Sequence, residues 1–316
     1  MDVYALPMTT RFRRITVREG LLLPGPAGWG EFCPFTEYDD AEAAAWLAAA
    51  REAAETGWPE PVRDRVPVNC TVPAIGPEHA QRIVRASGAT TAKVKVADPG
   101  AAPGEDEERV AAVRDALGPG GRIRVDANAA WSYDEAVAAI TSLERAAGGL
   151  EYVEQPCWEV EDLARVRRAV DVPVAADESI RRAEDPMRVV RAEAADVVVL
   201  KVSPLGGVRR ALRIADECGL PVVVSSAVES SVGLAAGLAL AGALPELPYA
   251  CGLGTASLLT TDVVAADDRL VPAGGTLPVL RRAPEPVRAA EVAAPPERQQ
   301  WWRARYERVA GLAVTG

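Results

Sequence analysis

The feature that most constrains this fold is an alternation of short β-rich runs with helical stretches from about Val66 onward. Seven amphipathic stretches rich in Ala and Arg, such as 105–117, 133–147 and 208–218, are predicted as helices between the runs. Alternating strands and helices indicate a parallel sheet, and eight strands about 25 residues apart favour closure into a TIM-like (β/α)7β barrel. The predicted strands are 66–72, 91–97, 122–128, 150–156, 172–179, 196–203, 221–228 and 249–254.

An open, doubly wound α/β sheet is the alternative fold for the same alternation. Such a sheet usually carries a Gly-rich phosphate-binding turn after its first strand, and the segment CTVPAIGPE does not have that pattern. The barrel is therefore the favoured prediction.

The two ends of the chain have a different pattern. RITVREGLLL and GWGEFCPF are typical of strands in a meander, and a helix is predicted from Asp40 to about Glu55. The tail is Pro-rich after Asp262 and ends in an amphipathic stretch with Trp301 and Trp302, which we expect to pack against the N-terminal segment. We predict a smaller α+β domain from residues 1–65 and 263–316, and a catalytic barrel from residues 66–262.

Charge and composition exclude several classes of protein. The net charge is −10 and the pI is about 4.9, which argues against binding nucleic acid or an anionic membrane. No signal peptide is apparent, and the run of Gly, Ala and Leu at 233–244 is too short to cross a bilayer. The five cysteines are widely spaced without a CxxC pair, so we expect free thiols in a cytoplasmic protein. The sequence gives no indication of oligomeric state.

Three acidic residues end consecutive predicted strands: Asp126, Glu154 and Asp177. In a parallel barrel the carboxyl ends of the strands meet at one mouth, where active sites lie. Three carboxylates in one space take up protons unless a cation offsets them, and hard oxygen ligands without His or Cys favour Mg²⁺, for which Mn²⁺ could substitute. Capping of the following helices, or pairing with Arg, is the structural alternative. The single histidine, His79, lies in a helical segment and is expected to be an ordinary helix residue.

Lysine is rare, with three lysines against 32 arginines: Lys93, Lys95 and Lys201. Arg cannot lose its proton in a protein, whereas Lys can when its surroundings lower its pKa. Lys93 and Lys95 stand two residues apart on one strand, so both face the barrel interior. Lys201 ends a strand that lies four strands further round the barrel, on the opposite side of its mouth. A lysine on each side of a bound carboxylate suits removal of the adjacent proton, with the charge stabilised by Mg²⁺ and the other lysines.

The strand ends TAKVKV, VDAN, EQP, ADES and LKVSPLGG together resemble the enolase superfamily, muconate-lactonizing subgroup. The segment VVVSSAVESSVGLAAGLALAGALPELPYACGLGT is similar to the o-succinylbenzoate synthases, lyases (dehydratases) of menaquinone biosynthesis. The resemblance spans residues 66–262. It implies that the smaller domain caps the barrel and that Gly28–Glu31 belongs to a mobile loop over the active site. The segment ahead of the barrel is shorter than in most relatives.

The resemblance also implies a role for each matching residue. Asp126, Glu154 and Asp177 would be the magnesium ligands. Lys95 would remove the ring proton beside the carboxylate of 2-succinyl-6-hydroxy-2,4-cyclohexadiene-1-carboxylate and then protonate the departing hydroxyl. Lys201 would stabilise the enediolate from the opposite face, with Lys93 supporting Lys95 electrostatically. The implied substrate contacts are Asn128, Ser226, Gly252 and Gly254.

Other functions remain compatible with the residues. An N-succinylamino acid racemase, or another isomerase of the subgroup, needs only a base on each face of its substrate. A metal-free lyase could use Lys201 or Lys95 as a Schiff-base nucleophile, and a barrel could bind a ligand without turnover. The segment CGLGT lacks an Asp-x-Asp pair, which argues against a dipeptide epimerase.

Overall fold

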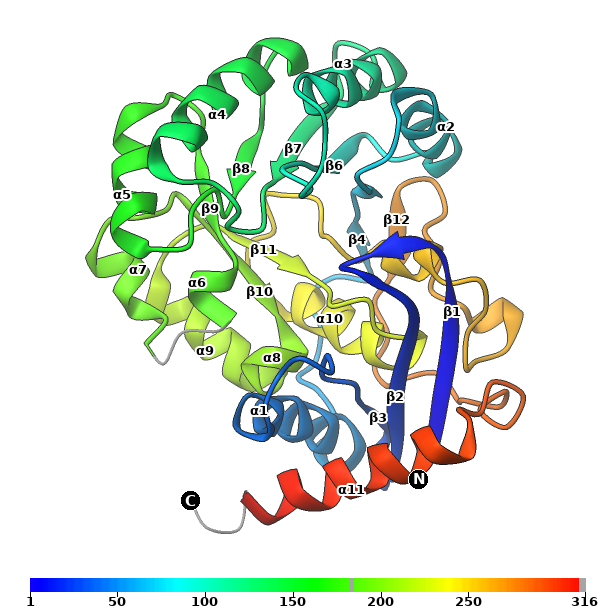
Figure 1. Ribbon diagram of the computed structural model, residues 1–316. Helices are drawn as coiled ribbons and strands as arrows, with labels where there is room; N and C mark the ends of the chain where they lie inside the picture. The colour runs from blue at the N-terminus through cyan, green and yellow to red at the C-terminus, as the bar shows by residue number, and fades with distance from the viewer. Residues whose placement is uncertain (182–184, 313–316) are drawn as a thin grey trace.

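The computed structural model describes residues 1–181 and 185–312. They form a barrel of parallel strands and surrounding helices, with an antiparallel sheet and two helices packed on one side (Figure 1). This arrangement confirms the predicted fold class. The domain boundaries at residues 65 and 262 stay predictions.

The barrel is built on one seven-stranded parallel sheet in the order β11-β10-β9-β8-β7-β6-β5. Val68 bridges Cys251, and Ser225 bridges Gly252, both in parallel. Residues 251–252 therefore lie between the two edges of the sheet and close the barrel. The strands are β5 (Cys70–Val72), β6 (Thr91–Lys95), β7 (Arg122–Asp126), β8 (Tyr152–Glu154), β9 (Val174–Ala176), β10 (Val197–Lys201) and β11 (Val222–Ser225).

The helices cover the outside of the sheet (Figure 1). Three of them, α3, α4 and α9, have the bounds predicted from the sequence. Ser132 begins α4 with a capping box in which its hydroxyl accepts from the Glu135 amide. The helices of the barrel are α2 (Pro77–Ser87), α3 (Glu105–Leu117), α4 (Tyr133–Ala147), α5 (Val160–Ala169), α6 (Glu178–Arg181), α7 (Met187–Arg191), α8 (Val202–Leu205), α9 (Val208–Cys218) and α10 (Ser231–Ala243), with short 3-10 turns η2 (Thr255–Leu258) and η3 (Ala266–Asp268).

The predicted strand 66–72 forms two short strands in the structure, and each of them is hydrogen-bonded to a different strand. β4 (Arg65–Pro67) pairs antiparallel with β12 (Thr276–Pro278) from the C-terminal tail, whereas β5 pairs in parallel with β6. Between them, the Asn69 amide donates to the Cys251 carbonyl at 3.0 Å. Only the second half of the predicted strand therefore belongs to the barrel sheet.

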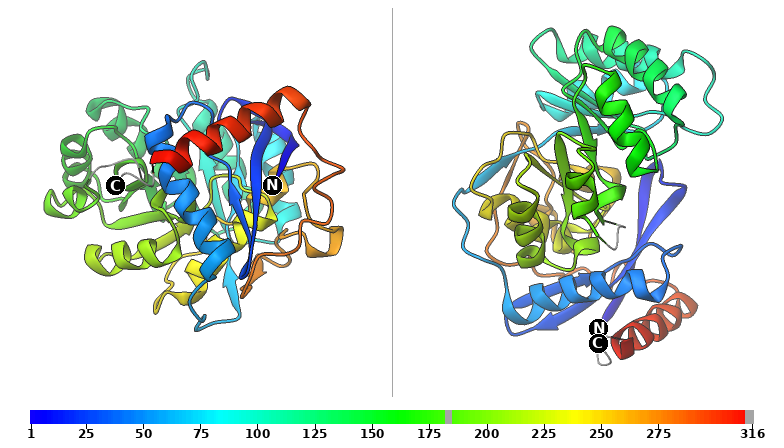
Figure 2. Two further views of the ribbon diagram at one scale, coloured as in Figure 1. Left: turned by 90° about the horizontal axis from the view of Figure 1, so that it is seen from below. Right: turned by 90° about the vertical axis from the view of Figure 1, so that its left-hand side faces the viewer.

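The capping part begins with a meander of β1 (Asp2–Phe12), β2 (Ile15–Gly25) and β3 (Gly28–Phe32). It continues into α1 (Asp40–Arg51) and a π-helical turn, η1 (Glu52–Thr56). The C-terminal helix α11 (Pro296–Leu312) lies beside α1 and the meander (Figure 2). Trp302 of α11 is buried, and its indole Nε1 donates to Glu19 at 3.1 Å. The expectation that the tail packs against the N-terminal segment is confirmed.

The prediction that GWGEFCPF contains a strand of the meander is confirmed, whereas the loop that the resemblance implied at Gly28–Glu31 is not what the structure shows. These residues form β3, which is hydrogen-bonded to β2, and Glu31 is buried. The Glu31 carboxylate accepts from Tyr4 Oη at 2.5 Å and from the Ser230 and Gly233 amides at 3.1 and 2.8 Å. The segment therefore joins the cap to the start of α10.

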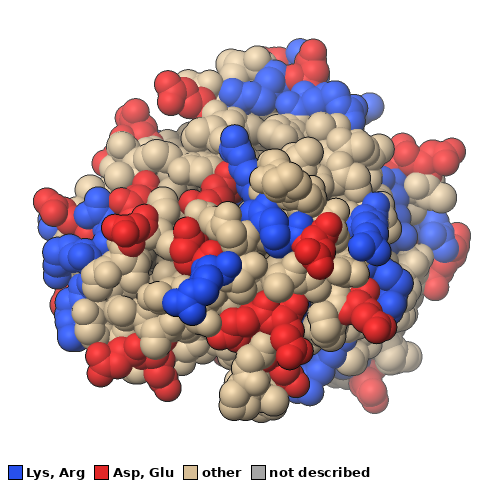
Figure 3. Space-filling view, turned by 90° about the horizontal axis from the view of Figure 1, so that it is seen from above, with Lys and Arg blue, Asp and Glu red and all other residues tan. Residues whose placement is uncertain are grey.

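The cysteines, the helices and the surface charges can be compared with the expectations from composition. All five cysteines are buried and unpaired. None of the helices in the described ranges is both long and apolar enough to span a bilayer. On the face seen in Figure 3, acidic and basic side chains are interspersed.

Candidate active site

The strand register brings the predicted site residues to one rim of the barrel. Lys95 of β6 pairs with Asp126 of β7, and Asp126 pairs with Glu154 of β8. On the far side, Lys201 of β10 pairs with Ser225 of β11. The apolar residues of each strand bury it in the sheet, so its polar end projects at the mouth.

Asp126, Glu154 and Asp177 have no solvent exposure. The ammonium of Lys93 lies between two of them, with Nζ at 3.0 Å from Asp126 Oδ2 and 2.9 Å from Glu154 Oε1. Lys95 donates to Asp126 Oδ2 at 2.5 Å. This side of the mouth is therefore a compact cluster of two ammonium groups and two carboxylates.

The other side of the mouth is centred on Asp177. Its Oδ2 accepts from Lys201 at 2.5 Å, and its Oδ1 accepts from Arg181 at 3.0 Å. β10 stands four strands from β6 in the sheet. Lys201 thus approaches the row of carboxylates from the side opposite to Lys93 and Lys95.

The two lysines of β6 have opposite pKa shifts. Burial opposes the charged form of Lys93, but the carboxylates of Asp126 and Glu154 outweigh it and raise the pKa of Lys93 well above its usual value. Burial lowers the pKa of Lys95, and the nearby charge of Lys93 lowers it further. Lys95 is therefore the member of the pair whose neutral amine, the form that can accept a proton, is more accessible.

The carboxylates also differ from one another. Burial and the charges of Asp126 and Asp177 raise the pKa of Glu154 to about 7, in spite of its contact with Lys93. Burial opposes ionisation of Asp126 and Asp177 as well, but the cations beside each of them lower its pKa. Glu154 is therefore the carboxylate of the three that takes up a proton most readily.

This charge balance bears on metal binding. Within residues 1–181 and 185–312, no three Asp, Glu, His or Cys side chains form a group that could hold a metal ion as they stand. The carboxylate oxygens contact ammonium groups instead. The donor set still fits a hard divalent cation, since it offers carboxylate oxygens alone.

Three of the four predicted substrate contacts line the cavity that holds the lysines: Asn128, Ser226 and Gly252. Asn128 Oδ1 accepts from Lys95 at 2.7 Å. Ser226 donates to the Gly252 carbonyl at 2.7 Å. A Cβ on Gly252 would lie 2.5 Å from Ser225 Oγ, so a larger residue there would displace the Ser225 hydroxyl.

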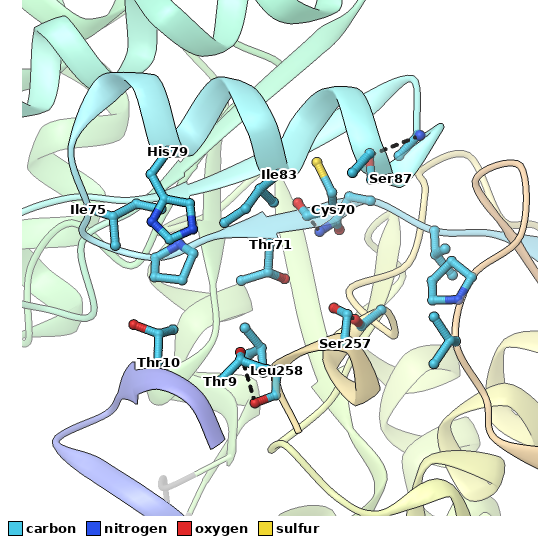
Figure 4. Close-up of a pocket in the computed structure, with 18 residues that line it drawn as sticks. Thr9, Thr10, Cys70, Thr71, Ile75, His79, Ile83, Ser87, Ser257 and Leu258 are labelled. Carbon is cyan, nitrogen blue, oxygen red and sulfur yellow. Dashed lines mark hydrogen bonds between the residues drawn. The ribbon is translucent and has the colours of Figure 1, made fainter. Parts of the chain in front are cut away.

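Gly254, the fourth, lines a neighbouring cavity of about 330 Å³. Figure 4 shows this cavity between α2 and the end of β1, with His79 and Ile83 directed toward Thr71 of β5. His79 is an exposed residue of α2, as expected. Thr71 borders both cavities, so the two spaces are neighbours across one side chain.

The structure adds residues that the sequence analysis missed. Phe12 and Arg13, at the turn between β1 and β2, line the lysine cavity, and Lys95 Nζ lies 5.6 Å from the centre of the Phe12 ring. Arg181 and Glu178 of α6 lie on the opposite side, where Glu178 Oε1 accepts from Arg181 at 2.5 Å and from Asn128 at 3.2 Å. The run RFRR at 11–14 is the only sequence signal for the first pair, and its position over the barrel follows from the meander's packing.

Two family models match the chain. Residues 77–284 match the model described as enolase C-terminal domain-like, and residues 3–54 match enolase N-terminal domain-like.

Similar curated proteins cover nearly the whole chain, and each of the following is named o-succinylbenzoate synthase. The protein of Thermobifida fusca (strain YX) is 66% identical over 302 residues, which is 96% of this chain and 93% of the relative. The protein of Mycolicibacterium smegmatis is 57% identical, covering 96% and 92%. The protein of Mycobacterium tuberculosis (strain H37Rv) is 55% identical, covering 99% and 94%.

Solved structures with low sequence identity share the fold. Muconate lactonizing enzyme from Pseudomonas fluorescens, complexed with muconolactone, has a TM-score of 0.78 at 22% identity and covers 93% of this chain and 97% of its own. Dipeptide epimerase from Enterococcus faecalis, complexed with Mg and L-Leu-L-Tyr, has a TM-score of 0.73 at 22% identity and covers 90% and 98%. The curated relatives and the family models establish that the chain belongs to the o-succinylbenzoate synthase family of enolase-like proteins.

Proposed function

We propose that this protein is a magnesium-dependent o-succinylbenzoate synthase. It removes water from 2-succinyl-6-hydroxy-2,4-cyclohexadiene-1-carboxylate and forms 2-succinylbenzoate, a step of menaquinone biosynthesis. The observation that carries the proposal is the placement of Lys95 and Lys201 on opposite sides of a row of buried carboxylates at the barrel mouth. The identity of 55 to 66% to curated synthases supports this substrate.

Lys95 is the acid and base of the reaction. Its lowered pKa makes the neutral amine more accessible, and this amine takes the ring proton beside the substrate carboxylate. The resulting ammonium then gives that proton to the hydroxyl leaving from the adjacent carbon. One proton and one hydroxide leave as water, and the ring becomes aromatic.

Lys201 and Lys93 act through their charge. Lys201 approaches from the opposite side of the site, where its ammonium stabilises the enediolate formed when the proton is removed. Lys93 lies against Asp126 and Glu154 and lowers the pKa of Lys95. The three lysines therefore have separate tasks, which Arg could not take over in the case of Lys95.

Asp126, Glu154 and Asp177 would hold the Mg²⁺ ion. When bound, the ion supplies Lewis-acid stabilisation of the substrate carboxylate. The same oxygens now accept from Lys93 and Lys201, so metal and ammonium groups compete for them. Asn128, Ser226 and Gly252 line the space left for the substrate.

The test is turnover by the purified protein in the presence of Mg²⁺, followed as formation of 2-succinylbenzoate. We expect conversion that EDTA abolishes and added Mg²⁺ restores. Racemization of N-succinylamino acids is measured in parallel. Racemization without dehydration would instead identify an isomerase, and activity insensitive to EDTA but trapped by borohydride would indicate a Schiff-base mechanism.

A further inference from the structure

The turn between β1 and β2 places an arginine in the candidate active site. Arg13 lines the same cavity as Lys201, Ser226 and Gly252. Arg13 and its neighbour Arg14 have φ angles of +48° and +65°, a left-handed conformation that non-glycine residues seldom adopt. Two consecutive residues of this kind form a tight turn that points the hairpin tip at the barrel mouth.

Arg13 differs from the other cations of this cavity in the kind of group that its side chain contacts. Lys93, Lys95, Lys201 and Arg181 each contact a carboxylate. For Arg13, the described part of the chain supplies a cation–π contact and no carboxylate: its guanidinium lies 4.3 Å from the centre of the Phe35 ring. Stacking on an aromatic face orients the guanidinium and leaves its N–H groups free to bind an anion.

The Phe35 ring also locates Arg13 relative to the barrel. Arg18 lies 4.4 Å from the centre of the same ring, and it donates to the carbonyls of Val228 and Ala227 at 3.0 and 3.3 Å. Arg13 is therefore on the side of the mouth where Ser226 and the segment after β11 lie. Lys95 and the Phe12 ring occupy the other side of the hairpin tip.

We propose that Arg13 binds the second carboxylate of the substrate, at the end of its succinyl arm. This inference rests on the proposed function, because that substrate carries one carboxylate beside the reacting carbon and another at the end of the arm. The substrate carboxylate beside the reacting carbon belongs to the part of the site formed by Lys95, Lys201 and the three strand-end carboxylates of the protein. Arg13 recognises the second through the paired N–H groups of its guanidinium, and it selects substrates with an acidic arm.

The neighbouring arginines do not fit this role. Arg11 and Arg14 are exposed, and they line an outer hollow together with Lys95 and Asn128 but not the cavity that contains Lys201 and Ser226. Arg14 is therefore a matched control, since it lies in the same turn with the same backbone conformation.

Binding of two probes to the wild-type protein and its variants, with Mg²⁺ present, tests the proposal. The probes are 2-succinylbenzoate and 2-butanoylbenzoate, in which a methyl group replaces the arm carboxylate. In Arg13→Gln we expect the affinity for 2-succinylbenzoate to fall by about 10- to 100-fold and that for 2-butanoylbenzoate to stay unchanged. Arg14→Gln should bind both probes within about threefold of wild type.

A loss of both probes in Arg13→Gln would assign Arg13 a structural role and overturn the proposal, as would wild-type affinity for 2-succinylbenzoate. Arg13→Lys, which keeps the charge, should recover part of the lost affinity for 2-succinylbenzoate alone. If the wild-type protein neither turns over nor binds 2-succinylbenzoate, the proposed function fails. If it does both and only the Arg13 variants disagree, the failure is confined to the Arg13 assignment.

Discussion

Asp177 contacts two cationic side chains in the candidate site, as Asp126 also does. Lys201 and Arg181 each donate to one of its oxygens, and it has no solvent exposure. Its negative charge is therefore shared between Lys201, Arg181 and the metal ion that we propose. Removing that charge while keeping the shape of the side chain isolates its contribution.

We predict that Asp177→Asn weakens Mg²⁺ binding at least tenfold and abolishes turnover at ordinary magnesium concentrations, because a neutral amide is a poorer ligand for a hard cation. Titration calorimetry with Mg²⁺ measures the first effect and product formation the second. Asp115→Asn, at an exposed position on α3, is the control and should behave as wild type. Unchanged metal affinity in Asp177→Asn would remove this residue from the proposed ligand set.

The sequence predicts the strand-end residues of the site better than the residues that cover it. Lys95, Asp126 and Lys201 stand out because each follows an apolar strand, and parallel strands present their carboxyl ends together. Arg13 and Arg181 belong to a hairpin turn and a four-residue helix, whose positions depend on long-range packing. Local sequence patterns carry no information on such packing.

Among the secondary-structure elements, β3 links the cap to the barrel. The segment GWGE was predicted as part of a meander strand, whereas the family resemblance implied a loop over the active site. The structure gives a reason for one of its glycines: a Cβ on Gly30 would lie 1.9 Å from the Ala50 carbonyl oxygen. Glycine thus permits α1 to pack directly on the backbone of β3.

We predict that Gly30→Ala destabilises the protein by about 1 to 3 kcal/mol, because the added methyl group meets backbone that cannot move aside cheaply. Urea unfolding followed by circular dichroism gives the free energy of unfolding. Gly120→Ala is the control, since no heavy atom lies within 4 Å of the Cβ that it would add. Equal stability of the two variants would contradict this account of β3.

On the scale of the whole molecule, the C-terminal tail holds the cap and the barrel together. β12 pairs with β4 at the start of the barrel, while α11 packs on α1 and the meander (Figures 1 and 2). The barrel was predictable because its alternating pattern repeats along the chain. The exchange of partners at β4 was not, because β12 lies more than 200 residues away in sequence.

We predict that Trp302→Ala lowers the free energy of unfolding by about 3 to 5 kcal/mol, because it leaves a cavity where a buried indole packs on Phe32. Urea unfolding again provides the measurement. Trp301→Ala removes a half-buried indole from the same helix and should cost clearly less. A similar loss in both variants would show that burial of Trp302 is not what fixes α11.

Two lysines on opposite sides of the barrel mouth serve one proton transfer: Lys95 performs it and Lys201 stabilises its product. The turnover numbers of Lys95→Arg and Lys201→Arg measure both roles. Arg keeps the positive charge but cannot act as a base near neutral pH. The account predicts that both variants fold, as judged by circular dichroism, and that Lys95→Arg loses turnover by about 10²- to 10⁴-fold or more. Lys201→Arg should lose a comparable factor, because the longer planar group misplaces the stabilising charge. A wild-type turnover number in either variant would contradict the mechanism.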